Sequence, residues 1–512
     1  MSEKSRNENF IEIMDTTLRD GEQTPGVCFA PREKLDIARC LLSRLKADRV
    51  EIASARSADS ELDAVKDIAA WAETHGHLEQ LEILTFIDGG KSLAWVANSG
   101  CRTVNLLAKG SEEHCRVQLR KSPQRHRDDL SRELDTAFKY GFNVNVYLEA
   151  WSQGVEDNFT YVCNMLDMLS QFPVKRIMLA DTLGILTPDK CALYVKWMRS
   201  AFPELRFDFH GHNDYGMVTA NSLAAVNSGI NGIHTTINGL GERTGTQALA
   251  QLVVTLHDFT DFRTRIVEKE LQNASRLLQA LSGKRCAWNT PVIGSDVYTQ
   301  TCGVHADGDR KGSLYMNRLS PERFGRQRDY ALGKLSGKAS IERNLTLLGL
   351  DTELNDDERT QLLAEIVRLG ERKHMVSPAD LPFIVSGIKK SPQKKQLQIV
   401  SVKSTSCLNG VPKATVAVKY ADRTVENSAN GTGSYDAFVK ALKKCLKLFK
   451  LSMPKLLDYE VRIPPGGRTD ALVETTITWS FSGKVFITSG VDSDQLLAAV
   501  AATEKMLNFT VK

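Results

Sequence analysis

The chain has 512 residues, 42% of them hydrophobic and 25% charged, which is ordinary for a globular protein of about two to four domains. Its formal net charge of +4 is too small to indicate binding to nucleic acid or to an anionic membrane. No apolar run approaches the ~20 residues that span a bilayer, residues 1–10 lack the apolar core of a signal peptide, and the ten cysteines form no C-x-x-C pair, so we expect a cytoplasmic protein with reduced thiols.

The first ~260 residues alternate short β-rich runs with amphipathic helical runs such as Pro31–Lys46 and Pro188–Ser200. Eight runs have strand character: Ile11–Thr17, Arg49–Ser54, Leu81–Ile87, Thr103–Lys109, Asn143–Ala150, Arg176–Asp181, Arg206–His212 and Gly232–Asn238. Strand–helix alternation predicts a parallel sheet, and eight units predict a closed (β/α)8 TIM barrel. A doubly wound open sheet is the alternative, but the glycine-rich dinucleotide fingerprint does not follow the first predicted strand.

Several predicted strands alternate polar and apolar residues. In Asn143–Glu149 the aliphatic set should face the helices and the polar set should line the barrel, which places Glu149 near the carboxyl-terminal mouth. Thr182 comes directly after the sixth predicted strand and continues its inward-facing set of residues. His234 and Asn238 share one face of the eighth predicted strand. Catalytic groups of this fold converge at that mouth.

After the barrel, Thr264–Gly283 is predicted to be helical and Asn289–Gly312 to be loop-rich. The loop-rich stretch includes Gly303–Asp309, which is either a solvated connection or a functional flap. Helical patterns resume in Leu332–Leu350 and Asp356–Gly370.

A basic linker, Lys389–Lys395, precedes a C-terminal region that repeats itself. Its predicted elements are two strands, a helix, three strands and a second helix: Leu397–Ser404, Ala414–Tyr420, Tyr435–Phe449, Asp458–Ile463, Leu472–Ser480, Lys484–Thr488 and Ser493–Leu507. Two β-rich units, each closed by one helix, predict a pseudo-twofold α+β module. We therefore expect a catalytic barrel at 1–265, linker and flap subdomains at 266–395, and a module for ligand sensing or dimerisation at 396–512.

A candidate metal site lies in the seventh predicted strand. Polar and apolar residues alternate in Phe207–Asp214, so that His210 and His212 share one strand face. Neutral imidazole commonly binds divalent metals, although two unrelated surface histidines would give the same pattern. Asp20 follows the first predicted strand and would face both histidines across the mouth of a barrel. An Asp/His/His set with open positions suits Mn²⁺, Mg²⁺ or Zn²⁺, and Arg19 would add a permanent cation beside it.

Three segments in this order resemble the signatures of the isopropylmalate, homocitrate and citramalate synthase family: Thr17–Gln23, His210–Asp214 and Asn238–Arg243. The likeness extends over nearly the whole chain. The resemblance is greater to the long-form citramalate synthases, which carry an effector domain. Three further segments support this closer resemblance: Asn105–Ser111, Asn145–Glu149 and Val304–Asp309. One position departs from the family, because Thr246 stands where an asparagine near the metal is usual, and we expect lower metal affinity or rate from it.

The resemblance implies a Claisen-type condensation, in which acetyl-CoA adds to a 2-oxo acid and hydrolysis of the thioester releases coenzyme A. Asp20, His210 and His212 would then hold a divalent metal that chelates the oxo acid and polarises its carbonyl. Arg19 would stabilise the alkoxide that forms when the carbonyl is attacked, and Thr182 would hydrogen-bond the substrate carboxylate.

The resemblance also implies a base for the methyl group of acetyl-CoA, and the sequence leaves Glu149 and His305 as alternatives. His305 matches a histidine that reaches over the mouth of a partner subunit, so a homodimer is expected. Asp307 would orient His305, and Tyr315 is a further candidate from the same segment.

The nature of the oxo acid is predicted from Leu84, Leu107 and Tyr147, which match the pyruvate pocket of citramalate synthases. Bulky walls exclude the isopropyl group of 2-oxoisovalerate, although ordinary barrel-core side chains would give the same pattern. We therefore expect citramalate formation from pyruvate in isoleucine biosynthesis. The alternative is 2-isopropylmalate formation in leucine biosynthesis.

The C-terminal module would, by resemblance, bind a branched-chain amino acid as a feedback effector, isoleucine for a citramalate synthase or leucine for an isopropylmalate synthase. The matching positions are Tyr435, Asp436, Leu456, Tyr459, Ile463 and Val473. An aliphatic effector needs apolar walls, and its ammonium group needs a carboxylate such as that of Asp436. Two competing hypotheses are a lyase of the same barrel group and an inactive amino-acid sensor.

Overall fold

The structure is a computed structural model that describes residues 9–56, 59–348, 350, 354–371, 376, 380–389, 397–463, 472–482 and 484–510. Two compact units divide the chain. The first consists of Met1–Tyr298 and Asn317–Gln327, and the second of Thr299–Met316 and Arg328–Lys512. Most of the predicted linker Lys389–Lys395, and with it the boundary at 395, lies outside the described residues.

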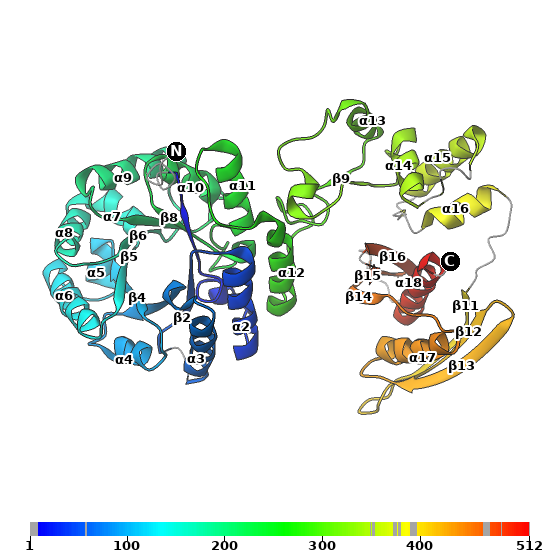
Figure 1. Cartoon of the computed structure of the whole chain (residues 1–512), viewed down its shortest axis with the longest axis horizontal. Coiled ribbons are helices and arrows are strands. Elements are labelled where there is room, and N and C mark those ends of the chain that lie inside the picture. Colours follow the sequence, from blue (N-terminus) through cyan, green and yellow to red (C-terminus); the bar gives the residue numbers. More distant parts are fainter. Residues whose placement is uncertain are drawn as a thin grey trace. The chain divides into compact units, whose positions relative to one another are not determined.

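The first unit is a closed barrel of eight parallel strands that follow one another in sequence order (Figure 1). The predicted TIM barrel is therefore confirmed. Its strands are β1 (Glu12–Asp15), β2 (Arg49–Ser54), β3 (Leu81–Phe86), β4 (Thr103–Lys109), β5 (Asn143–Glu149), β6 (Arg176–Asp181), β7 (Phe207–Gly211) and β8 (Gly232–Thr235). The eighth strand is shorter than predicted, because Asn238 has a φ of 61° and lies in a 3-10 turn, so it does not share a strand face with His234.

Helices surround the strands (Figure 1). They are α2 (Pro31–Arg39), α3 (Asp59–Thr74), α4 (Lys91–Ala97), α5 (Glu112–Val117), α6 (Pro123–Lys139), α7 (Trp151–Asp157), α8 (Phe159–Leu169), α9 (Pro188–Ala201), α10 (Val218–Asn227), α11 (Leu249–Phe259) and α12 (Leu271–Ser282). Proline begins α2, α6 and α9, at the position where its missing N–H has no intrahelical partner. The predicted helix Pro31–Lys46 is α2 followed by a π-helical turn, Cys40–Leu45.

The alternation in β5 separates two environments as predicted. Val144, Val146 and Leu148 are fully buried in the core between strands and helices. The side chain of Asn145 instead donates to Asn105 Oδ1 at 2.9 Å, inside the barrel. Burial of each aliphatic side chain contributes roughly 1.5–3 kcal/mol to folding, which fixes the register of the strand and with it the inward direction of the polar set.

Two segments after the barrel differ from their predicted structure. The predicted helix Thr264–Gly283 begins only at Leu271, because residues 264–270 form a loop and a 3-10 turn. The predicted loop Gly303–Asp309 is a helix, α13 (Gly303–Gly312), within the second unit. A Cβ atom at Gly303 would lie 2.7 Å from Gly337 Cα, so glycine here permits a close approach of two backbones rather than marking a loop.

The second unit also holds short strands β9 (Thr299–Gln300) and β10 (Asp329–Tyr330), and helices α14 (Lys338–Leu348), α15 (Asp356–Glu371) and α16 (Leu381–Ile388). These helices share an apolar core that includes Ile341, Leu345, Leu362 and Ile366. The sequence had predicted α14 and α15 but not the short α16.

The C-terminal residues form two three-stranded antiparallel sheets, each followed by one helix. The elements are β11 (Leu397–Thr405), β12 (Lys413–Tyr420), β13 (Arg423–Asn430), α17 (Ser434–Leu448), β14 (Lys455–Arg462), β15 (Val473–Phe481), β16 (Lys484–Asp492) and α18 (Gln495–Thr510). The predicted pseudo-twofold repeat is confirmed, and β13 is the strand that the sequence had not indicated. One core joins both halves, with Val416, Phe438, Ile477 and Trp479 among its members.

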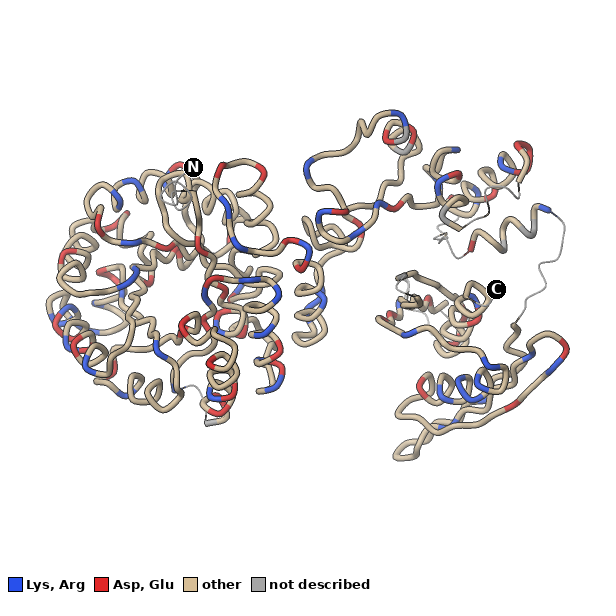
Figure 2. The backbone as a smooth tube through the Cα atoms, viewed as in Figure 1, with Lys and Arg blue, Asp and Glu red and all other residues tan. Residues whose placement is uncertain are grey.

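Charge is mixed over the barrel helices, where both signs occur along the same segments, whereas basic residues gather on α17 (Figure 2). That helix contributes Lys440, Lys443, Lys444 and Lys447. Among the described residues, none of the helices combines the length and the apolar character that a bilayer crossing requires.

Candidate metal centre and active site

The loop after β1 turns sharply and directs Asp20 into the mouth of the barrel. The carbonyl of Thr16 accepts the backbone N–H groups of Arg19 at 3.1 Å, Asp20 at 2.8 Å and Gly21 at 3.1 Å. Glu22 fixes the outer end of the loop, since its carboxylate accepts the N–H of Phe29 at 2.9 Å and pairs with the buried Lys34 at 2.6 Å.

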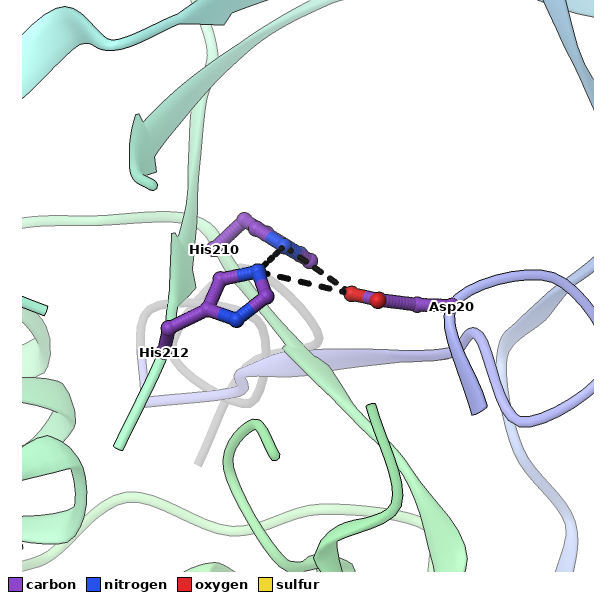
Figure 3. Close-up of side chains that lie close together, drawn as sticks. All are labelled: Asp20, His210 and His212. Carbon is purple, nitrogen blue, oxygen red and sulfur yellow. Dashed lines mark hydrogen bonds and ion pairs between the residues drawn. The ribbon is translucent and has the colours of Figure 1, made fainter. Parts of the chain in front are cut away.

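Asp20, His210 and His212 converge at this mouth, with His210 and His212 at the end of β7 (Figure 3). Asp20 Oδ2 lies 3.2 Å from His210 Nε2 and 3.8 Å from His212 Nε2, and the two Nε2 atoms are 3.4 Å apart. All three side chains are buried. In the closed barrel only β8 lies between β7 and β1. This neighbourhood explains how Asp20 and His210, which are 190 positions apart in the sequence, can meet.

The donor set fits a divalent metal. Neither carboxylate oxygen of Asp20 has a hydrogen-bond partner within the described residues, although both are buried. Burial disfavours the Asp20 anion, yet Arg19 and the two histidines hold the pKa of its carboxyl well below the ordinary range. Burial, with the neighbouring His210, lowers the pKa of His212 to about 4, so its imidazole is neutral at physiological pH, as a metal ligand must be.

Thr246, which the resemblance aligned with an asparagine near the metal, lies beside this cluster. Its backbone forms an antiparallel bridge with His212, and its side chain is buried. Thr246 Oγ1 is 3.2 Å from the hydroxyl oxygen of Thr236, a contact that takes up part of its hydrogen-bonding capacity.

Arg19 is held in one orientation by three partners. Its Nε donates to Glu51 Oε2 at 2.6 Å, its Nη2 donates to the Tyr147 hydroxyl at 3.2 Å, and its Nη1 lies 3.8 Å from Asp20 Oδ2. Glu51 was not singled out from the sequence, although a glutamate inside a barrel strand is a signal that could have found it. Glu51 is fully buried and also accepts from Asn105 Nδ2 at 2.8 Å.

The predicted pocket residues do lie together on the inner face of the barrel. Leu84 and Tyr147 are buried in one cluster with Met14 and Met178, and the partly buried Leu107 packs against it. The Tyr147 hydroxyl, through Arg19, connects this apolar wall to the metal cluster. Met14 and Met178 were not predicted to belong to the pocket.

Glu149 ends β5 at the mouth and forms an ion pair with Lys109 at the end of the neighbouring β4. The next residue, Ala150, adopts the left-handed conformation with a φ of 59°, and its N–H donates to Thr182 Oγ1 at 2.9 Å. A non-glycine residue with positive φ is uncommon and tends to occur at functional sites. Lys109 was not predicted, but its carboxyl-terminal position on β4 is a usable signal in this fold.

The predicted flap residues belong to the second unit. His305 and Tyr315 stack with their ring centroids 4.1 Å apart. Asp307 pairs with Lys311 at 2.6 Å along α13. That Asp307 orients His305, and that His305 reaches a barrel mouth, stay predictions.

The predicted effector positions lie in both C-terminal repeats. Tyr435 on α17 and Tyr459 on β14 have ring centroids 4.8 Å apart, and the Tyr435 hydroxyl lies 2.9 Å from Thr503 Oγ1. The Asp436 carboxylate accepts from Lys440 at 2.7 Å and from the Thr432 N–H at 2.9 Å. The remaining predicted positions differ in exposure: Val473 is buried, whereas Leu456 and Ile463 are exposed.

Comparison with known families assigns each part of the chain. Residues 10–278 match the HMGL-like family, residues 292–374 match a homocitrate synthase post-HMGL domain-like family, and residues 375–511 match the LeuA allosteric (dimerisation) domain.

The barrel, the buried Asp/His/His cluster at its mouth and the repeated C-terminal module define a class of protein, the acyltransferase-type synthases that carry an allosteric domain. The chain belongs to the HMGL-like family, and its relatives include proteins named as citramalate and 2-isopropylmalate synthases.

Three relatives illustrate this membership. A protein of Methanopyrus kandleri, provisionally named an (R)-citramalate synthase, is 31% identical over 91% of this chain and 89% of its own length. A 2-isopropylmalate synthase of Methanocaldococcus jannaschii is 29% identical over 97% of this chain and 94% of its own. An (R)-citramalate synthase of the same organism is 28% identical over 98% and 99%.

Proposed function

We propose that this chain is a citramalate synthase, which condenses acetyl-CoA with pyruvate to give (R)-citramalate and coenzyme A and acts in isoleucine biosynthesis. The observation that carries the proposal is the buried cluster of Asp20, His210 and His212 with Arg19 beside it. A divalent cation held by these three ligands, Mn²⁺, Mg²⁺ or Zn²⁺, would act as a Lewis acid toward the keto group of the oxo acid. Relatives named as (R)-citramalate synthases support the reaction.

Arg19 stabilises the alkoxide that develops on the keto oxygen. Its ion pair with Glu51 and its hydrogen bond to Tyr147 preorganise the guanidinium, so that little reorganisation accompanies the reaction. Thr182 binds the substrate carboxylate. Because Thr182 Oγ1 already accepts the Ala150 N–H, its own proton is available for donation to that carboxylate.

Glu149 removes a proton from the methyl group of acetyl-CoA, and the resulting carbanion forms the new bond to the keto carbon. The ion pair with Lys109 holds the Glu149 carboxylate in place. Water then attacks the thioester carbonyl, the C–S bond breaks and coenzyme A leaves as the thiol. His305 on α13, contributed by a partner subunit of a homodimer, is the alternative base.

Pyruvate is favoured as the oxo acid because Leu84, Tyr147 and Leu107 form a bulky apolar wall, which would hinder an isopropyl group more than a methyl group. A 2-isopropylmalate synthase is the second candidate, and the relative so named supports it. The test is release of the coenzyme A thiol from acetyl-CoA with pyruvate or with 2-oxoisovalerate. A higher kcat/KM with 2-oxoisovalerate would assign the second activity.

The C-terminal module is proposed to bind isoleucine as a feedback inhibitor, or leucine if the oxo acid is 2-oxoisovalerate. The match to an allosteric dimerisation domain supports this placement. Tyr435 and Tyr459 provide apolar surface where the two repeats meet. Removal of residues 396–512 should abolish inhibition by isoleucine, and inhibition that persists would refute the placement.

A further inference from the structure

A third buried imidazole, His234 on β8, lies against the metal cluster. Its Nδ1 is 3.3 Å from His210 Nδ1 and 3.1 Å from the Tyr147 hydroxyl. Its Nε2 faces Asp208 Oδ2 at 3.6 Å and has no hydrogen-bond partner among the described residues. His234 is 1% exposed and Asp208 is fully buried.

Strand register produces this arrangement. Asp208 and His210 are two residues apart on β7 and therefore share its inner face. In the pairing of β7 with β8, Asp208 lies opposite Gly232, which places His234 beside His210. A Cβ atom at position 232 would lie 2.6 Å from Asp208 Oδ1, so glycine leaves the space that the Asp208 carboxylate occupies.

The charges determine where the protons lie. Asp208 forms an ion pair with Arg49, whose guanidinium is a permanent cation, so the Asp208 side chain is present as a carboxylate. A carboxylate can only accept, so the favoured tautomer of His234 carries its proton on Nε2, toward Asp208. His234 Nδ1 is then an acceptor.

His210 is the donor that fits this acceptor. Its Nε2 faces Asp20 and His212, so its Nδ1 carries the proton when Nε2 is a ligand. The Tyr147 hydroxyl has a second acceptor besides His234, since it can donate to Glu51 Oε2 at 3.3 Å while it accepts from Arg19. The Nδ1 proton of His210 then has an acceptor in His234 Nδ1 at 3.3 Å, while the Nε2 proton of His234 faces the Asp208 carboxylate at 3.6 Å.

We infer that His234 is a positioning residue of the metal site, which accepts the Nδ1 proton of His210 and, backed by Asp208, keeps His210 Nε2 free and aimed at the metal. The inference rests on the proposed role of Asp20, His210 and His212 as ligands. Partners of this kind commonly change metal affinity by 10–100-fold. A histidine that only filled space in the barrel would have no such effect.

The experiment measures the dissociation constant of Mn²⁺ for the full-length apoprotein by calorimetry, and the absorption spectrum of the Co²⁺ form. His234→Leu removes the acceptor and should weaken Mn²⁺ binding about 10–100-fold. His234→Asn keeps an oxygen near the position of Nδ1 and should restore most of the affinity. His234→Gln, whose amide extends toward Asp208 instead, should bind as weakly as His234→Leu and replaces it if that variant does not fold.

Two controls make the result decisive. His126→Leu also removes a buried imidazole, one that accepts the Lys109 N–H at 3.1 Å, and should leave Mn²⁺ affinity unchanged. His210→Ala should abolish tight binding, and if it does not, the proposed metal site itself is wrong. If His210→Ala loses Mn²⁺ binding but His234→Leu and His234→Gln bind Mn²⁺ as the unaltered protein does, the inference about His234 is overturned and the proposed metal site stands.

Discussion

Substitution of Leu84 tests how the chain selects its oxo acid. Leu84 is buried in the inner cluster with Met14, Tyr147 and Met178. Leu84→Ala removes three carbon atoms from this wall, whereas 2-oxoisovalerate carries two carbon atoms more than pyruvate. If the space accepts those two carbons, their burial contributes about 0.8 kcal/mol each, or about 1.6 kcal/mol in total. The ratio of kcat/KM for 2-oxoisovalerate to that for pyruvate should therefore rise about 15-fold at 25 °C.

The assay follows release of the coenzyme A thiol with each oxo acid at saturating acetyl-CoA. Leu179→Ala is the matched control, because Leu179 on β6 is also buried but belongs to the outer core between strands and helices. Both variants should lose stability, by about 2–5 kcal/mol for a buried leucine. Only Leu84→Ala should change the ratio.

An unchanged ratio in Leu84→Ala, with the variant folded as judged by circular dichroism, would refute the assignment of Leu84 to the substrate pocket. An equal rise in Leu179→Ala would show that general loosening of the barrel causes the change.

Three further predictions concern charge, backbone and pH. Arg19→Lys cannot keep both the Glu51 and Tyr147 contacts, so kcat should fall about 10²–10³-fold in steady-state assays, and an unchanged kcat would exclude a role for the guanidinium. Ala150→Gly relieves the steric strain of a left-handed backbone conformation, so the free energy of unfolding should rise by about 1 kcal/mol in denaturant titrations. A fall in the free energy of unfolding would show that Ala150 is not strained. Burial, with Lys121 nearby, lowers the pKa of His126 to about 4, so the unfolded chain binds a proton that the fold does not. His126 should therefore lower the free energy of unfolding by about 3 kcal/mol as the pH falls from about 6.5 to 4. Denaturant unfolding across that pH range measures this loss, which should be absent in His126→Leu.

The barrel and the metal cluster were predictable because they depend on periodicity and topology. Polar alternation in β5 and β7 fixed which side chains face inward, and eight strand–helix units implied closure. In a closed parallel barrel all carboxyl-terminal strand ends meet at one mouth, so Asp20 and the two histidines could be expected to meet without knowledge of any distance.

The contact partners of the supporting residues could not be predicted, because these contacts depend on the register of neighbouring strands. Glu51, Lys109 and His234 each contact a residue on another strand or on the loop after β1. A register shift by one residue would turn each of them to the opposite face. The sequence alone does not specify the register to that accuracy.

The helix α13 was predicted as a loop because three glycines lower the helix propensity of its sequence. Its formation depends on tertiary contacts that the sequence pattern does not reveal, such as the ion pair of Asp309 with Arg328 at 2.9 Å. The strand β13 was missed for a related reason. Its residues are mostly polar, and it forms a strand because it pairs along its whole length with β12.

The proposed condensation requires one divalent cation held by Asp20, His210 and His212. The most direct measurement is the metal content and the thiol-release rate of the full-length protein and of Asp20→Asn, before and after treatment with EDTA and after addition of Mn²⁺. We expect about one bound ion per chain, loss of the rate with EDTA and its return with Mn²⁺. In Asp20→Asn we expect neither tight metal binding nor recovery of the rate. Full activity of the metal-free protein with pyruvate, or normal metal binding by Asp20→Asn, would contradict the proposal.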